Sequence, residues 1–253
     1  MTLGVTTLVL GVAMFATEAA AGPINPSYSF FGDLSGATFG GSGIPTDPTA
    51  VRTIVDGANT ITMGLTAFGR YQNPALSNNG AGTFVATPGS NTGDPNNPAA
   101  PPHPLGTTWG FGYYVAIAGG GTFADYDFDL LYDLNPGVDT DETQFGRIDL
   151  NNFVVPATTV LEDAQSLLFA FFAGVPVIPG VTPPPGYPPA TFDPNAQGEY
   201  TLALRASKLV PGVGYQTLGL SAIDVRVVPE PTALALLGLS LVGLVKTSRR
   251  RIR

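Results

Sequence analysis

The sequence predicts an all-β fold, an antiparallel β-sandwich or jelly-roll-like body with long proline-rich loops. Three observations carry this prediction. The 253 residues include 32 Gly and 24 Pro, a composition rich in turns. Charged residues, which fill exposed helix faces, make up only 12% of the chain. Apolar residues recur with a period of two, which is typical of half-buried antiparallel strands.

The alternation is clearest in two segments. In 59–68 Ile61, Met63 and Leu65 share one side, and in 198–207 Tyr200 and Leu204 do so. In 213–228 the apolar phase slips near Ala222, which predicts a β-bulge there. About eight to ten strands are expected in a single core from about 27 to 228. The further candidate strands are 82–87, 107–118, 124–134, 144–150 and 165–172.

Two proline-rich segments, 87–105 and 175–192, interrupt these strands. Proline cannot donate to a sheet ladder, so neither segment can form a central strand, and both are expected to be surface loops. The chain's one histidine, His103, lies among prolines in the first of them. A Ser–His–Asp site needs a positioned imidazole, and a flexible loop supplies one poorly. The sequence therefore predicts a protein that is not an enzyme, although paired carboxylates for glycosidic cleavage stay open.

Charge and cysteine content exclude further classes of function. The chain has no cysteine and a formal net charge of −8. Segments 1–21 and 229–253 hold five of the eleven basic residues and two of the nineteen acidic ones, so the remaining 22–228 carries six against seventeen. Phosphate would repel such a body, so no nucleic-acid partner is expected.

The N-terminal residues 1–21 have the pattern of a signal peptide. An apolar stretch from Leu3 to Phe15 precedes Ala19-Ala20-Ala21, and small residues at these positions suit cleavage after Ala21. No Lys or Arg precedes the apolar stretch, unlike an ordinary signal peptide. A buried N-terminal helix is the alternative interpretation.

The C-terminal residues combine an apolar run with a basic end. The uncharged run 232–245 would span about 21 Å as a helix, short of the ~30 Å hydrocarbon core of a bilayer. Basic residues after such a helix stay on the cytoplasmic side. They are Lys246, Arg249, Arg250, Arg251 and Arg253. The pattern predicts a transmembrane helix with the body outside and the tail inside.

Pro229-Glu230-Pro231, the apolar run and the arginine cluster together resemble the PEP-CTERM sorting signal of exported bacterial proteins. The resemblance covers 229–253 and implies processing by an exosortase in bacteria that make exopolysaccharide. It further implies an inner-membrane intermediate, followed by the cell surface or the extracellular space. An ordinary single-span anchor is the alternative. Stretches 109–115, 126–136 and 192–201 are loosely similar to exported proteins of this kind.

The acidic segment 124–152 is the one candidate for metal binding. Asp133, Asn135, Asp139 and Asp141 supply the oxygen ligands that calcium prefers. Their spacing departs from an EF-hand loop, since Gln144 stands at the twelfth position. A solvated acidic strand face that leads into a turn is the favoured interpretation, and no other cofactor is expected.

Aromatic residues of the same region could form a platform for sugar stacking. The candidates are Trp109, Tyr113, Tyr114, Tyr126 and Tyr132. Core positions are expected for Tyr126 and Phe128, while Tyr113 and Tyr114 stay open. The sequence as a whole predicts an exported, non-catalytic protein of the cell envelope or extracellular matrix, associated with exopolysaccharide or biofilm. A carbohydrate-binding or adhesive module is the alternative, and a secreted glycan-active enzyme is a weaker one.

Overall fold

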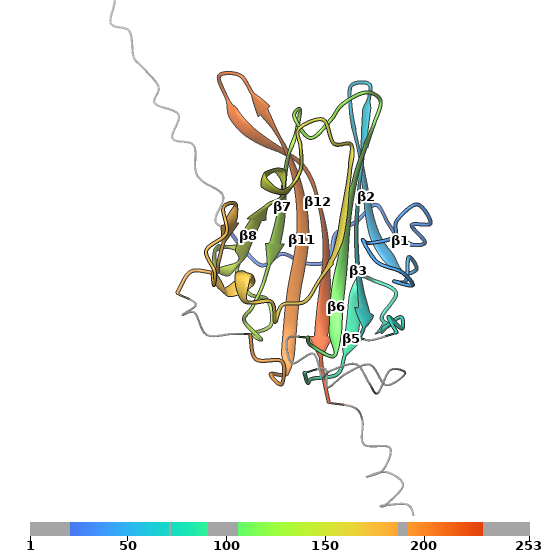
Figure 1. Ribbon diagram of the computed structural model, residues 1–253, viewed down its shortest axis with the longest axis vertical. Coiled ribbons are helices and arrows are strands. Elements are labelled where there is room, and N and C mark those ends of the chain that lie inside the picture. The colour runs from blue at the N-terminus through green and yellow to red at the C-terminus, as the bar shows by residue number, and fades with distance from the viewer. Residues whose placement is uncertain (1–20, 71, 91–105, 187–191, 230–253) are drawn as a thin grey trace, which may run out of the picture.

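The computed structural model describes residues 21–70, 72–90, 106–186 and 192–229. Two β-sheets pack face to face in these residues, and the only helices among them are three short 3-10 turns (Figure 1). The predicted all-β, antiparallel sandwich is therefore confirmed. No helix within the described ranges is long and apolar enough to cross a membrane. The predicted C-terminal helix, at 232–245, lies outside them.

The first sheet has five antiparallel strands in the order β1-β2-β3-β6-β9. Strands β2 and β3 form a hairpin whose turn contains Gly57 at φ +61°, a conformation that glycine adopts without strain. The strand bounds are β1 (Phe30–Gly32), β2 (Thr49–Asp56), β3 (Asn59–Gly69), β6 (Trp109–Ala118) and β9 (Val160–Gln165).

The second sheet has seven strands in the order β10-β8-β7-β11-β12-β5-β4. All neighbours are antiparallel except β12 and β5, which are parallel. The long β11–β12 hairpin extends beyond the sandwich at the top of Figure 1. The strand bounds are β4 (Ser77–Asn78), β5 (Thr83–Ala86), β7 (Asp127–Tyr132), β8 (Gly146–Asp149), β10 (Val181–Thr182), β11 (Gly198–Val210) and β12 (Gly214–Val227).

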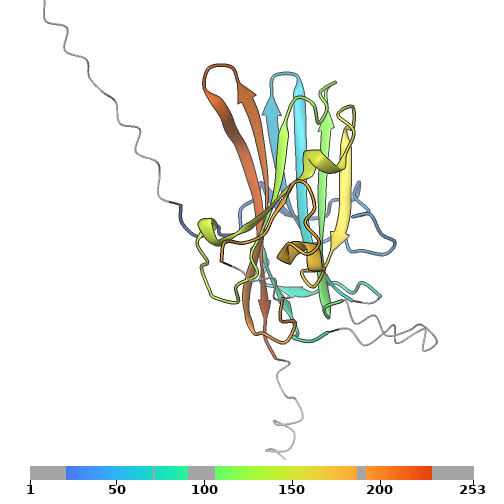
Figure 2. The ribbon, with the colours of Figure 1, turned by 60° about the vertical axis from the view of Figure 1, so that its left-hand side comes forward.

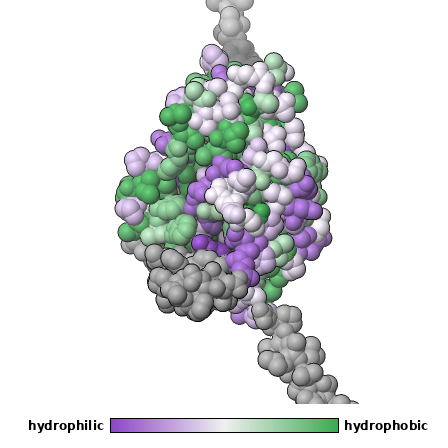
Figure 3. Space-filling view, turned by 45° about the vertical axis from the view of Figure 1, so that its right-hand side comes forward, coloured by the Kyte–Doolittle hydropathy of each residue, from purple (hydrophilic) through white to green (hydrophobic). Residues whose placement is uncertain are grey.

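The core lies between the two sheets, which Figure 2 shows as two layers. The alternating residues predicted from the sequence meet there, with Ile61 and Met63 from β3 and Leu202 and Leu204 from β11 all fully buried. Full burial of such a side chain contributes about 1.5–3 kcal/mol. On the face seen in Figure 3, hydrophobic and hydrophilic residues are interspersed.

The predicted strand 165–172 is wrong. Strand β9 ends at Gln165, and the chain then turns into the 3-10 helix η3 (Ala170–Ala173). The segment from Leu167 to Phe172 is apolar at every position, so it has no polar side to leave in water as a half-buried strand would. The turn instead buries Leu167 and Phe172 in the core.

The predicted bulge occurs in β12 but four residues earlier than expected. The register between β11 and β12 shifts at Ala206/Ser207, where Leu218 is the extra residue. Leu218 packs against the main core. Leu220 faces the other side of the sheet and packs with a small cluster around Leu131 and Phe145. The phase slip in the sequence therefore reflects two separate apolar clusters.

The N-terminal part of the described chain crosses the outer face of the seven-stranded sheet. The carbonyl of Gly22 accepts a hydrogen bond from the amide of Glu142 at 3.1 Å. Pro23 forms a bridge with Asp141, and Ser27 forms one with Ala222 in β12. The fold therefore includes the chain from residue 22 onward.

Candidate functional site

Polar side chains gather on the outer face of the seven-stranded sheet, the face opposite the core. Phe128 and Leu130 of β7 point inward and are fully buried, so the alternate residues Asp127 and Asp129 point outward. Arg205 of β11 lies beside Asp129 in the sheet register. Arg147 of β8 lies opposite Leu131 of β7, so three strands place polar residues on one surface.

An ion-pair network organises this surface. The carboxylate of Asp129, whose residue is only 4% exposed, lies 2.5 Å from Arg147 Nε and 3.3 Å from Arg205 Nη2. Arg205 Nη1 also donates to Glu142 at 2.7 Å. Asp127 lies at the edge of the network, 3.7 Å from Arg147. Burial raises the pKa of the Asp127 carboxyl, and the neighbouring carboxylate of Asp129 raises it further.

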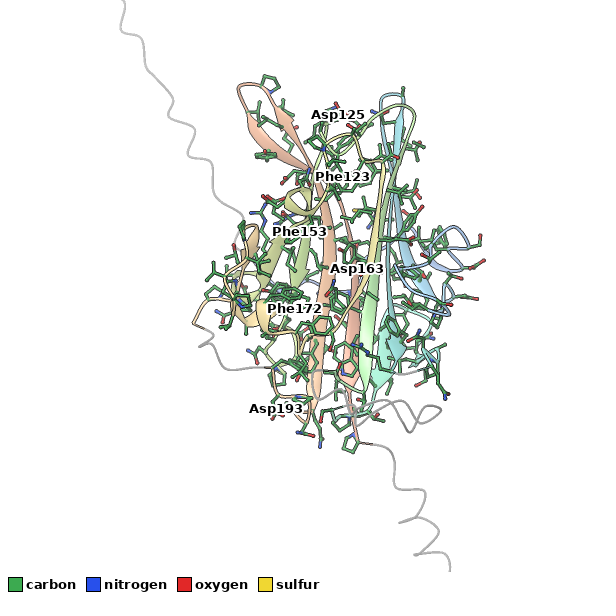
Figure 4. All side chains as sticks on the ribbon, viewed as in Figure 1. Phe123, Asp125, Phe153, Asp163, Phe172 and Asp193 are labelled. Atoms are coloured by element: carbon green, nitrogen blue, oxygen red, sulfur yellow. The ribbon has the colours of Figure 1, made fainter. Side chains whose placement is uncertain are left out.

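The network forms one wall of a hollow of about 460 Å³. It is lined by Asp127, Asp129, Arg147, Asp149, Arg205, Ser207, Tyr215 and Thr217. A second hollow of about 280 Å³ shares Asp127 and Tyr215 with the first, and Asp125, Asn151 and Leu209 are among its other lining residues. Figure 4 shows Phe123 and Asp125 toward the end of the molecule from which the β11–β12 hairpin extends. We call the two hollows together the outer groove.

The open mouth between the two sheets holds a smaller hollow of about 200 Å³. Tyr113, Phe153, Leu161 and Phe171 are among the residues that line it. Burial raises the pKa of the Tyr113 hydroxyl, with a further contribution from a nearby carboxylate. This hollow is more apolar than the outer groove and lies beside the core.

The four calcium candidates all lie in or beside the loop between β7 and η1 (Glu142–Gln144), where oxygens of three of them bind local amides. Asp133 Oδ1 accepts from the amide of Asn135 at 2.7 Å, and Asn135 Oδ1 accepts from Gly137 at 2.9 Å. Asp141 Oδ1 accepts from the amide and the hydroxyl of Thr143. Within the described ranges no group of three or more His, Cys, Asp or Glu side chains could hold a metal ion. The solvated acidic face favoured from the sequence, with calcium binding as its alternative, stays a prediction.

Two carboxyl groups near this loop are buried. Asp133 is 1% exposed, and its Oδ2 has no hydrogen-bond partner within the described part of the chain. Asp224 of β12 is 7% exposed and accepts from the Thr201 hydroxyl at 2.8 Å. The pKa of each is raised to about 6, chiefly by burial and to a lesser extent by the neighbouring carboxylate of Glu199.

The aromatic residues considered for a sugar-stacking platform do not form one. Trp109, Tyr113, Tyr126 and Tyr132 are buried, and Tyr114 is half-buried beside a small cluster around Phe39. Trp109 and Tyr113 from β6 and Tyr132 from β7 occupy inward positions and fill the main core, as does Tyr126 just before β7. The core position expected for Phe128 is confirmed. Three aromatic residues of the described chain are exposed, Phe30, Phe153 and Tyr215, and Tyr215 is the most exposed, at 65%. Tyr215 lies at a strand end with no strong alternation in the sequence.

The proposed sorting residues begin where β12 ends. Val227, the last residue of β12, is buried, and the amide of Val228 donates to the carbonyl of Ala86 at 2.9 Å. Pro229 follows at once. Glu230, Pro231 and the basic residues of the tail lie outside the described residues, as does His103.

Comparison with known proteins identifies this end of the chain. The family model described as the PEP-CTERM protein-sorting motif matches residues 227–251. No curated protein and no solved structure matches the chain. The predicted resemblance is thus confirmed over the C-terminal segment. The chain carries a PEP-CTERM protein-sorting motif, which marks it as an exported protein that transits a membrane and is sorted by an exosortase.

Proposed function

We propose that the chain is a non-catalytic protein of the cell envelope or extracellular matrix, associated with exopolysaccharide. Its β-sandwich body, 22–228, is the delivered part, and its C-terminal segment is the delivery signal. A processing enzyme of the exosortase type and the membrane are its partners during export.

One observation carries this proposal. The matched motif begins at Val227, the last residue of a strand that lies between two others, β11 and β5. No separate linker stands between the body and the signal, because Val228 is still hydrogen-bonded to the sheet. Removing the segment after Pro231 would take no described strand from the sandwich.

The N-terminal end supports the same division. Gly22 is the first residue after the proposed cleavage site, and its carbonyl already accepts a hydrogen bond from Glu142. Cleavage after Ala21 would thus leave a chain whose first residue belongs to the fold.

The outer face supports a body without catalysis. Asp129 is held between two guanidinium groups. The Asp149 carboxylate accepts hydrogen bonds from the backbone amide of Asn151 and the side-chain amide of Asn152. A carboxylate tied in this way is a poor general acid, because losing its charge would break the pairs that hold it.

The experiment is an intact-mass measurement on protein recovered from the outside of producing cells. We expect a mass from which residues 1–21 are absent, and from which the apolar run and the basic tail, 232–253, are also absent. A delivered protein that still contains 232–253 would contradict processing and would leave the single-span anchor as the better account.

A further inference from the structure

We propose that the outer groove is a binding site for an oligosaccharide of neutral or amino sugars. This inference rests on the proposed function, since it names the class of matrix component that the delivered body would hold. The residues that line the groove all lie outside the sorting motif at 227–251.

The groove offers several hydrogen-bonding groups that have no partner in the described part of the chain. The hydroxyls of Ser207, Tyr215 and Thr217 line it, and none has a hydrogen-bond partner among the residues that the structure describes. Asp127 makes only the long 3.7 Å contact with Arg147, so its oxygens can accept further bonds. A hydroxyl both donates and accepts, so these groups match the donors and acceptors of sugar hydroxyls.

Tyr215 gives the groove its apolar surface. Its ring is 65% exposed and lies where the two hollows meet, with the 59% exposed Leu209 opposite it in the register of the hairpin. An exposed ring with a polar tip suits the C–H face of a pyranose and one of its hydroxyls together. Two hollows on either side of one ring suit adjacent sugar units of a chain.

The ion-pair network makes the site rigid. Asp129 is buried between Arg147 and Arg205, so the guanidinium groups that face the groove are fixed before a ligand arrives. Groups that are already ordered lose less entropy on binding. The strands beneath them also hold their side chains more firmly than a loop would.

The charge of the groove decides which sugars fit. Four carboxylates line it, Asp125, Asp127, Asp129 and Asp149, against two guanidinium groups. Excess negative charge repels uronic acids and sulfated sugars and attracts protonated amino sugars. Neutral sugars are accepted through hydrogen bonds and the tyrosine ring.

The test uses the full chain purified in a detergent without a sugar headgroup. The protein is applied to an array of bacterial neutral, amino-sugar and acidic oligosaccharides, and the tightest ligand is then titrated by calorimetry. We expect binding to neutral or amino-sugar members and weaker or no binding to acidic ones. Tyr215→Ala should weaken the affinity about tenfold, the scale of one lost ring contact.

Phe30→Ala is the matched control, because Phe30 is also an exposed aromatic, 46% exposed, but lies on β1 of the other sheet. It should change the affinity less than twofold. No binding to any oligosaccharide on the array would overturn the proposal, as would equal binding of acidic members or an unchanged affinity of Tyr215→Ala. A correctly processed protein that binds no sugar would refute the groove alone and leave the proposed function standing.

Discussion

The two buried carboxyl groups should make the protein less stable at neutral pH than at mildly acidic pH. Asp133 and Asp224 each have a pKa of about 6 in the fold, against an ordinary value of 3.8. The folded state therefore binds protons more tightly than the unfolded state between these values. Unfolding then releases protons, so the free energy of unfolding falls as the pH rises from about 4 to about 6.

The size of the effect follows from the shift. A shift of about two pKa units corresponds to about 3 kcal/mol of stability for one group. This is an upper bound for Asp224, because it is 7% exposed and water partly screens its charge. Asparagine has the same shape and no charge. Asp133→Asn should therefore raise the free energy of unfolding at pH 7.5 by about 1–3 kcal/mol and change it little at pH 4. Asp224→Asn should act in the same direction.

The assay is urea denaturation at pH 4, 5, 6 and 7.5 at constant ionic strength. Asp56→Asn provides a control of opposite sign. Hydrogen bonds from Lys208 and Tyr126 lower the pKa of Asp56, so its contribution is present above pH 3.8 and is lost as the pH falls through the lowered value. This variant should lose stability at pH 7.5. If both buried-site variants keep the wild-type slope between pH 4 and 6, the reasoning is refuted.

Four further outcomes are expected. Phe172→Ala should lower the free energy of unfolding by about 3–5 kcal/mol in urea denaturation, because the buried ring packs against three other aromatic rings. Gly146→Ala should lower the melting temperature sharply, since the added Cβ would clash with the buried ring of Tyr132. Millimolar calcium should raise the melting temperature very little. Calcium at ~100 times its Kd would add about 2.7 kcal/mol to the free energy of unfolding, so a rise of many degrees that Asp139→Ala abolishes would instead establish a calcium site. Replacing 249–251 with glutamine should reduce correct processing, measured as the share of delivered protein with the processed mass, because each basic residue contributes roughly 1 kcal/mol of attraction to anionic lipid.

The sequence predicted the elements whose pattern is local. In 59–68 the alternation alone identifies a strand and its buried side, and β3 has that side in the core. The same reasoning missed β2, where Ala50 and Val51 are both buried because each face of the strand start is covered. Strands of two or three residues, such as β10, are too short to show any period.

The outer groove could not be predicted in the same way. Its aromatic residue, Tyr215, and its two arginines come from β12, β8 and β11, and only the order of strands in the sheet brings them together. Alternation shows that Arg205 points to the face of β11 opposite Leu204. It does not show that Arg147 lies near Arg205. The acidic run was visible, whereas the cations that pair with it were dispersed in the sequence.

The position of the final strand constrains when the protein can fold. Strand β12 completes the sheet by lying between β11 and the much earlier β5, and the segment at Ser27 also pairs with it. These contacts join the first part of the body to its last residues, so their loop-closure cost is high and folding is correspondingly slow. In the proposed export from the N-terminus, the earlier strands would leave the membrane first, and β5 and β11 would stay unjoined until β12 emerges. The sorting segment follows β12 directly, so the body can close only when its delivery signal reaches the membrane.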